Sequence, residues 1–456
     1  MITQQALTAA EYARALRRLV EAGVAFCLLR DLPEDVRAGA DLDVLIAPVD
    51  RGKALAAFAA EGFVLRRGAG APLKSVFVRY CHGALLTLDV HWGMVQQGLR
   101  YGDESAALAR RRGSEDAPRL SPEDELIHLV AHGLLRGRPP DTARRVRAVE
   151  LLDGALDRAY IEERVQAFGY GDVFLGACAW LRAGSPAAHA RLRSRLTWAL
   201  IRRDPRNAIR LAAFRMSRLA RTDRRGGVIA LVGPDGAGKS TVLEAVMARG
   251  AGIRSPRLES VYLGPWGQLE TGLVRLTRRL GLIPSREPWG RRVAAMDAQF
   301  PQAALKWVRS EIKAIVFYPA MLAELWWRYL RSVAPRTRRG AWVVADRYIT
   351  DLRYLYKGDL MPNYRLLRAA VCWLYPMPAL FVLVDQTPEI IHRRKPGLSV
   401  EQIGAFQEAY RRALRGKRWM QITTDGTPEE AADRVLDAAV RLWAGERPPL
   451  DGRMGA

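Results

Sequence analysis

Cysteine, acidic residues and long apolar runs are all scarce in this sequence, and each scarcity argues against a class of protein. The 456 residues include four cysteines, which lie far apart and show no paired spacing. This pattern disfavours a disulfide framework and a zinc module, and it suits a reducing cytoplasm. No apolar run reaches about 18 residues, and the first residues lack a basic region followed by an apolar core. We therefore expect no export signal, no membrane-spanning helix and a cytoplasmic location.

Basic residues outnumber acidic ones by 71 to 48, which gives a formal net charge of +23 and predicts anionic partners. The excess is greatest between Arg191 and Arg225, where twelve arginines face two aspartates. Leucines recur there at near-helical spacing on either side of Asp204–Pro205, so the segment predicts two amphipathic helices. Such a pair is either a solvated linker or a surface that lies on an anionic membrane. Few stacking aromatic residues alternate with these arginines, so we expect no specific nucleic-acid binding.

A glycine-rich segment directly after the apolar run 228–232 is the most informative pattern in the chain. The residues from Gly233 to Thr241 satisfy G-x-x-x-x-G-K-[ST]. In this pattern the loop amides surround nucleotide phosphates, the lysine reaches the β- and γ-phosphates, and the next hydroxyl binds Mg²⁺. The sequence therefore predicts a P-loop for ATP and Mg²⁺, in which Lys239 is catalytic and Ser240 is a metal ligand. The predicted nucleotide-binding residues are Gly233, Asp235, Gly236, Ala237, Gly238, Lys239, Ser240 and Thr241.

Two further apolar runs, at 341–345 and 379–384, predict buried strands that end in charged residues. The carboxyl ends of parallel strands face the ligand crevice, so we expect Asp346 and Arg347 beside the P-loop. Asp346 is a candidate magnesium ligand, and Arg347 is a candidate for holding an anionic acceptor. A salt bridge between the two at the strand end is the structural alternative.

A cluster of cations after the second run predicts a basic flap over the phosphates. Arg393 and Arg394 are followed by Lys395, and a capping box at Ser399 then predicts a new helix. An ordinary helix end, which also favours cations because of the helix dipole, is the alternative.

These motifs resemble those of the thymidylate kinase family of nucleoside monophosphate kinases over about the last half of the chain. The resemblance implies that Asp235 contacts the sugar of the acceptor, that Arg347 in Asp346-Arg347-Tyr348 grips the acceptor phosphate, and that Arg393 and Arg394 are lid cations. It implies an ATP- and Mg²⁺-dependent phosphotransferase. The sequence departs from the family between Val261 and Trp342, where the family reads the nucleobase. The acceptor is therefore left open among thymidine monophosphate, a sugar, a nucleotide sugar and a lipid-linked molecule.

The first half of the chain carries a different set of candidate residues. Strands are expected at 25–30, 40–46 and 85–92. Alternation puts Asp41 and Asp43 on one face of the second strand, and Asp89 on the third is available to join them. Three converging carboxylates need a cation to stay ionised together, so they predict a site for one or two Mg²⁺ ions.

This arrangement resembles the nucleotidyltransferase superfamily, and residues 121–132 and 149–153 resemble the helical half of poorly characterised members. The resemblance implies attack on a nucleotide's α-phosphate. The Gly-Ser turn that normally holds the triphosphate is not apparent, since Leu29-Arg30 stands there instead. An active enzyme and a degenerate binding module are both open. His128 and His132 have metal-binding spacing but lack the glutamate of H-E-x-x-H, so we expect packed histidines.

The sequence thus predicts an α/β protein of about three domains. We expect a nucleotidyltransferase-like α+β domain (1–120), a helical companion (121–185), an arginine-rich linker (186–225) and a P-loop kinase-like domain (226–456) with a five-stranded parallel sheet covered by helices on both faces. The leading hypothesis is a kinase for an anionic small molecule, and the two-domain resemblance implies a role in surface polysaccharide synthesis. The alternatives are a nucleotide-switched, membrane-associated regulatory protein and a bifunctional kinase and nucleotidyltransferase. The resemblance also implies a homodimer.

Overall fold

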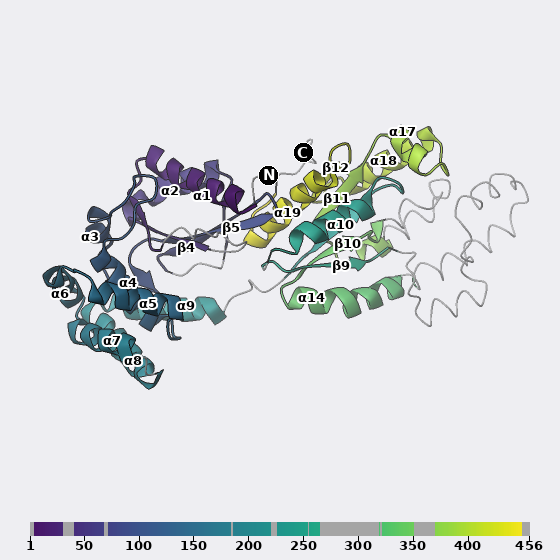
Figure 1. Cartoon of the computed structure of the whole chain (residues 1–456). Helices are drawn as coiled ribbons and strands as arrows, with labels where there is room; N and C mark the ends of the chain where they lie inside the picture. The colour runs from purple at the N-terminus through teal and green to yellow at the C-terminus, as the bar shows by residue number, and fades with distance from the viewer. Residues whose placement is uncertain are drawn as a thin grey trace, which may run out of the picture. The chain divides into compact units, whose positions relative to one another are not determined.

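The computed structural model describes residues 4–30, 41–67, 72–183, 186–219, 226–253, 255–264, 319, 322–350 and 370–448 (Figure 1). The chain divides into two compact units. The N-terminal unit comprises Met1–Asp223 with Ala444–Glu446, and the C-terminal unit comprises Arg224–Trp443 with Arg447–Ala456. Most of the segment between Val261 and Trp342, where the sequence departs from the kinase family, lies outside the described residues.

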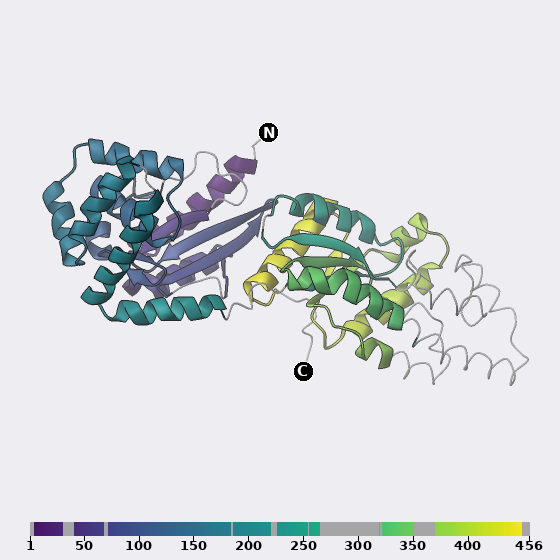
Figure 2. The same ribbon diagram turned by 90° about the horizontal axis from the view of Figure 1, so that it is seen from below.

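The N-terminal unit contains a five-stranded sheet of order β1-β2-β5-β4-β3. Its strands are β1 (Phe26–Leu28), β2 (Asp41–Ile46), β3 (Val64–Leu65), β4 (Lys74–Cys81) and β5 (Ala84–His91). β2 and β5 are parallel and the other neighbours are antiparallel, with β4 and β5 forming the long slate-blue hairpin in Figure 2. One face packs against α1 (Gln4–Glu21) and α2 (Arg51–Ala60), because alternate residues such as Leu42, Val44 and Leu88 are buried there.

Helices form the rest of this unit. They are α3 (Glu104–Ala109), α4 (Pro122–Leu135), α5 (Thr142–Asp153), α6 (Arg158–Ala167), α7 (Gly171–Ala183), α8 (Pro186–Arg203) and α9 (Arg206–Leu219), with a small hairpin of β6 (Val95–Gln96) and β7 (Leu99–Arg100) and a 3-10 turn η1 (Pro48–Asp50). α4 begins with Ser121 as its N-cap and Pro122 in the first turn, and the Ser121 side chain accepts a hydrogen bond from the Asp124 amide.

The arginine-rich segment forms two helices, α8 and α9, with the predicted break between them. Their leucines at 192, 196, 200 and 211 are buried with residues of α4 and α7 in one apolar core. The helix pair therefore packs as part of the N-terminal unit, whereas the sequence left open a solvated linker between domains or a helix pair on an anionic membrane. The side chains that remain exposed include Trp198, Ile209 and Met216.

The C-terminal unit contains the predicted parallel sheet of five strands, in the order β12-β11-β8-β10-β9. The strands are β8 (Val228–Val232), β9 (Leu258–Tyr262), β10 (Trp342–Asp346), β11 (Leu380–Asp385) and β12 (Trp419–Thr423). β8, β10 and β11 are almost wholly buried, as expected for parallel strands covered on both faces.

Helices flank this sheet (Figure 1). α10 (Lys239–Gly250) packs against β8, β9 and β10, and α19 (Pro428–Ala444) closes the chain. Helical residues 322–328 continue through a π-helical turn, η2 (Tyr329–Val333), into α14 (Ala334–Arg338). α17 (Pro388–Arg394) is followed by α18 (Val400–Leu414). Residues of α18 and of the helix 322–338 are buried in one core with Val228, Ala230 and Val232 of β8. None of the helices in the described part of the chain has the length and apolar character needed to cross a membrane.

Candidate functional site

Parallel pairing of β2 with β5 brings the predicted acids together. Asp43 lies opposite Asp89, Asp41 opposite Thr87, and Leu45 opposite His91. The flanking residues of both strands face the core with α1 and α2, so these acids lie on the other face. Ligand atoms of Asp43, Asp89 and His91 all lie within 4.8 Å of one another. We call these three residues the acid cluster; Asp41, which is exposed, lies two residues before Asp43 on the same face.

Two cations balance part of this negative charge. Arg30 Nε lies 2.9 Å from Asp43 Oδ2, and Lys74 Nζ lies 2.5 Å from Asp89 Oδ2. Burial acts to raise the pKa of Asp43, but the neighbouring His91 and the charges of Arg30 and Lys74 outweigh it and lower that pKa. Although the Asp41 side chain is exposed, its carboxyl group is partly desolvated by the surrounding residues, and this desolvation with the charges of Asp89 and Asp43 raises its pKa.

The acid cluster fits a divalent cation by one direct criterion. Asp89 Oδ1 and His91 Nδ1 are buried and have no hydrogen-bond partner among the described residues. An unsatisfied buried polar atom costs about 1–3 kcal/mol, and carboxylate oxygen and imidazole nitrogen are both metal ligands. Arg30 and Lys74 lie against the Oδ2 atoms of Asp43 and Asp89, whereas Asp43 Oδ1 lies 3.7 Å from His91 Nε2. His91 was missed in the sequence, although its position two residues after Asp89 puts it on the same face.

The stacked pair His128 and His132 lies near this cluster. Their rings are 4.9 Å apart, and Tyr101 Oη lies 2.8 Å from His128 Nδ1. Burial lowers the pKa of His128 to about 3, and burial with the neighbouring His128 lowers that of His132. Both rings are therefore neutral at pH 7, and the prediction of packed, hydrogen-bonded histidines agrees with these contacts.

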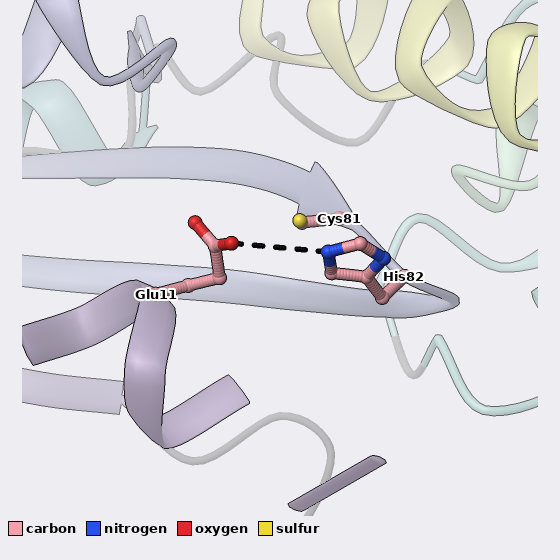
Figure 3. A group of neighbouring side chains, drawn as sticks. All are labelled: Glu11, Cys81 and His82. Atoms are coloured by element: carbon pink, nitrogen blue, oxygen red, sulfur yellow. Dashed lines mark ion pairs between the residues drawn. The ribbon is translucent and has the colours of Figure 1, made fainter. Parts of the chain in front are cut away.

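A second group with possible ligand atoms consists of Glu11 on α1, Cys81 at the end of β4, and His82 in the following turn (Figure 3). The His82 ring points toward the Glu11 carboxylate, with Nε2 3.8 Å from Oε1. Arg79 already lies 2.8 Å from Oε2, and Arg14 lies 3.2 Å from Oε1. Because both oxygens of Glu11 face guanidinium groups that repel a metal ion, this group is an ion-pair cluster.

In the C-terminal unit, the glycine-rich segment forms a tight loop between β8 and α10. Gly236 and Gly238 have φ of 91° and 95°, in the left-handed region that glycine adopts without a steric penalty. Gly233 has φ of 142°, and a Cβ there would lie 2.2 Å from the carbonyl oxygen of Val384. Lys239 is buried, and its Nζ donates to the carbonyls of Gly233 at 2.8 Å and Pro234 at 2.7 Å. The lysine thus lies across the loop that precedes it.

Asp235 lies at the centre of a group of cations at this loop. It forms an ion pair with Arg347, its Oδ2 is 3.1 Å from Lys395 Nζ, and its Oδ1 is 3.7 Å from Lys239 Nζ. Burial would raise the pKa of Asp235, but the charges of Arg347, Lys239 and Lys395 outweigh it, so the pKa is well below its usual range. Arg347 has φ of 63°, which is uncommon for a non-glycine residue and is often found at functional sites.

The other predicted site residues of the C-terminal unit lie on α10, β10 and α17. Ser240 and Thr241 are exposed in the first turn of α10. Asp346 ends β10, opposite Leu231 of β8, and is partly exposed. Arg393 and Arg394 end α17 and are exposed, with Arg394 Nη1 3.5 Å from the Gly236 carbonyl.

The capping box predicted at Ser399 is present at the start of α18. It fixes the turn that follows the cations of α17.

The sequence patterns assigned no function to Asp385, which ends β11 and is 2 % exposed. Its Oδ1 accepts from the Gln386 amide at 3.0 Å and from Gln407 Nε2 at 2.5 Å. Its Oδ2 accepts from Arg411 at 2.7 Å and from Gln421 at 3.1 Å. Asp385 therefore connects β11 to α18 and β12. It directly follows Val384, whose carbonyl lies against Gly233.

Comparison with known proteins adds information on the N-terminal unit. Residues 5–180 match the model of a family described as uncharacterised nucleotidyltransferases. The N-terminal unit is nucleotidyltransferase-like. Its match includes the acid cluster and helices α4 to α6, and it supports a transferase that acts in nucleotide transfer in general. No curated protein matches the chain.

Proposed function

We propose that the C-terminal unit is an ATP- and Mg²⁺-dependent phosphotransferase of the thymidylate kinase type. The observation that carries this proposal is the buried Lys239 ammonium, which lies across a left-handed glycine loop with Arg347 and Lys395 close by. Loop amides, a lysine and arginines at the carboxyl ends of parallel strands are the groups that bind and orient a polyphosphate.

Each side chain has a distinct part in this reaction. Lys239 would leave the loop carbonyls and contact the β- and γ-phosphate oxygens. Arg347 would exchange its ion pair with Asp235 for the acceptor phosphate, and Asp235 would then accept from the acceptor's sugar hydroxyl. Arg393 and Arg394 would close over the transferring group. These residues act by positioning and charge stabilisation.

The residues offered for Mg²⁺ are compatible with that ion. Ser240 and Asp346 supply oxygen atoms and are at least partly open to solvent. Ser240 lies on α10, which follows β8, and Asp346 lies on β10, which pairs with β8. Bound there, Mg²⁺ would neutralise charge that develops on the phosphates.

The acceptor is an anionic small molecule, since a guanidinium is available to hold it. A nucleoside monophosphate and a phosphorylated sugar both meet this condition. A role in surface polysaccharide synthesis rests on the family resemblance of the two halves. A lipid-linked saccharide would place the reaction at the inner face of a membrane.

Substitution of Lys239 tests the kinase proposal. Isotope-labelled ATP is incubated with the full-length chain and with nucleoside monophosphates, sugar phosphates or lipid extracts. We expect a labelled small product from the wild type, none from Lys239→Ala, and normal product from Lys53→Ala, which removes an exposed lysine in the other unit. Near-normal turnover in Lys239→Ala would rule out the assignment. Slow hydrolysis without a labelled product would favour the alternative of a nucleotide-switched regulatory protein.

A second activity, nucleotidyl transfer, is proposed for the acid cluster. The specific observation is the unpartnered Asp89 Oδ1 beside Asp43, in a unit whose sequence matches nucleotidyltransferases. Asp41, Asp43 and Asp89 would hold divalent metal, which would activate the acceptor for attack on the α-phosphorus. The bond to pyrophosphate then breaks and pyrophosphate leaves.

Pyrophosphate release measures this second activity. We expect release by the wild type, loss of release in Asp43→Asn, and no change in Asp172→Asn, which alters an exposed aspartate at the start of α7. Kinase activity at the C-terminal unit should be the same in all three proteins. Unchanged pyrophosphate release in Asp43→Asn would exclude the acid cluster.

A further inference from the structure

A cavity of about 360 Å³ lies beside the acid cluster in the N-terminal unit. Asp43 and His91 line it from β2 and β5, and side chains of α4 and α5 line it from the helical side. The volume is that of a small-molecule site and suits a nucleotide or a phosphorylated sugar. The cavity therefore joins the acid cluster to the helical half of the same unit.

The cavity has one more arginine than carboxylates, because Asp43, Glu125 and Asp141 also line it. Four arginines line it, and three of them face a carboxylate: Arg30 with Asp43 at 2.9 Å, Arg147 with Glu125 at 2.7 Å, and Arg144 with Asp141 at 3.7 Å. The Arg144 pair is long, so that charge is only weakly compensated.

The fourth arginine, Arg136, has no ion-pair partner in the part of the chain that the structure describes. Its pKa is lowered by burial and by the charges of Arg144 and Arg138. Repulsion between guanidinium groups raises the electrostatic free energy of this part of the cavity, and an anion bound between them would lower it.

The cavity wall also carries three histidines, beside the carboxylates of Asp43, Glu125 and Asp141. His128 and His132 line the wall, and both are held neutral by burial. His91, which is 1 % exposed, also lines the cavity, and its Nδ1 has no hydrogen-bond partner among the described residues. A buried imidazole nitrogen without a partner is a position that a ligand, a metal ion or a water molecule can satisfy.

We propose that this cavity binds a phosphate group of the N-terminal unit's substrate, with Arg136 and Arg144 contacting the phosphate oxygens and the reacting end of the ligand directed toward Asp43. The proposal rests on the nucleotidyl transfer proposed above and names the substrate chemistry that its helical wall recognises. Arg136 follows α4 and Arg144 lies in the first turn of α5, so two helices supply the binding groups. The phosphate belongs either to the nucleotide or to a phosphorylated acceptor, and both sources share the same recognition.

Calorimetry on the full-length chain tests the cavity. The Lys239→Ala background is used throughout, so that the glycine loop of the C-terminal unit does not contribute. ATP and glucose 1-phosphate are titrated separately with Mg²⁺ present, and they represent the two sources of phosphate. We expect at least one of them to bind, and the one that binds identifies the source.

The variants are Arg136→Gln combined with Arg144→Gln, the single variant Arg136→Lys, and the control Arg158→Gln, which removes an exposed arginine from α6. Loss of one charge-assisted hydrogen bond weakens binding by about tenfold, so the double variant should bind about a hundredfold more weakly. Arg136→Lys should retain most of the affinity because it keeps the charge, and Arg158→Gln should match the parent.

Two results would overturn the proposal: no binding of either probe, or equal affinity in the double variant and the Arg158→Gln control. These outcomes are separable from failure of nucleotidyl transfer. If Asp43→Asn retains pyrophosphate release while the double variant loses binding, the cavity stands and the reaction proposed for the cluster is wrong. If Asp43→Asn abolishes release while the double variant binds normally, the reaction stands and the cavity proposal is wrong.

Discussion

Replacement of Asp385 by asparagine should destabilise the C-terminal unit strongly. The carboxylate is buried and accepts two hydrogen bonds on each oxygen. Asparagine keeps one acceptor oxygen and replaces the other by an NH₂ group. The oxygen is expected to remain toward the Gln386 amide, so the NH₂ group would face the donors of Arg411 and Gln421.

The magnitude follows from the two bonds that are lost. A hydrogen bond to a charged group contributes about 1.5–3 kcal/mol, and a bond of ordinary strength contributes about 0.5–1.5 kcal/mol. Arg411 is 39 % exposed, so water compensates part of its loss. We therefore expect a loss of about 2–4 kcal/mol in the free energy of unfolding of this unit.

Hydrogen exchange of peptides from β11 and α18 reports this unit separately from the N-terminal one. The expected loss lowers protection by about 30- to 700-fold. Glu408→Gln is the matched control, because Glu408 also faces Arg411, at 3.9 Å, but is 48 % exposed. Its exposed pair should contribute less than about 1 kcal/mol. Equal protection in the two variants would show that burial does not strengthen the Asp385 contacts and would refute the reasoning.

Two further predictions concern the glycine loop and the stacked histidines. Gly233→Ala puts a Cβ 2.2 Å from the Val384 carbonyl oxygen, so it should displace the loop and weaken ATP binding in calorimetry. The control Gly252→Ala adds a Cβ with nothing within 4 Å and should bind ATP normally. Equal affinities in the two variants would contradict the loop assignment. The pKa of His128 is about 3 and that of His132 is also lowered, so the unfolded chain takes up protons near pH 6.5 that the folded chain refuses. The contribution of the two neutral histidines to folding stability is complete above that pH. Below it, each histidine lowers the folding equilibrium constant by about tenfold for every unit that the pH falls. Between pH 6 and 4, the folding constant of His128→Gln should fall about a hundredfold less than that of the wild type. Hydrogen-exchange protection of α4 measures this difference. An unchanged pH dependence would show that His128 is protonated in the folded protein.

The sequence was sufficient for the strands of the C-terminal unit but not for their arrangement. Continuous apolar runs between polar segments predicted β8, β10 and β11, because strands buried on both faces have no polar alternation. The position of β8 between β11 and β10 depends on crossover connections that no local pattern shows. The contact between Asp235 and Arg347, which are 112 residues apart, follows from that arrangement. The sequence assigned Asp235 to an acceptor's sugar and did not predict its three cationic neighbours.

In the N-terminal unit, alternation correctly placed Asp41 and Asp43 on one face of β2. The residues that surround these acids are set by strand register. Parallel pairing of β2 with β5 puts Asp89 beside Asp43, and antiparallel pairing of β4 with β5 puts Lys74 beside His91. Register is set by the whole sheet, so no short motif could supply Lys74.

The periodicity of the arginine-rich segment correctly predicted two helices. It could not show what covered their leucines, because a buried helix and a helix on a membrane have the same apolar stripe. Only the packing of α8 against α4 and α7 distinguishes the two.

The two proposed sites differ in the sign of their charge, and this difference argues for separate ligands in each. Around Asp235, three cations face one carboxylate, which leaves two positive charges at the glycine loop. Around Asp43, three carboxylates face Arg30 and Lys74, which leaves one negative charge. A polyphosphate lowers the electrostatic free energy of the first site, and a divalent metal ion lowers that of the second. If the two proposed assignments hold, the metal would have to bind the acids of the N-terminal unit before a phosphate approaches them, and the nearby arginines would hold that phosphate at a distance from the carboxylates. Phosphate binding at the N-terminal unit should thus depend steeply on divalent metal, whereas binding at the glycine loop should persist, more weakly, without it.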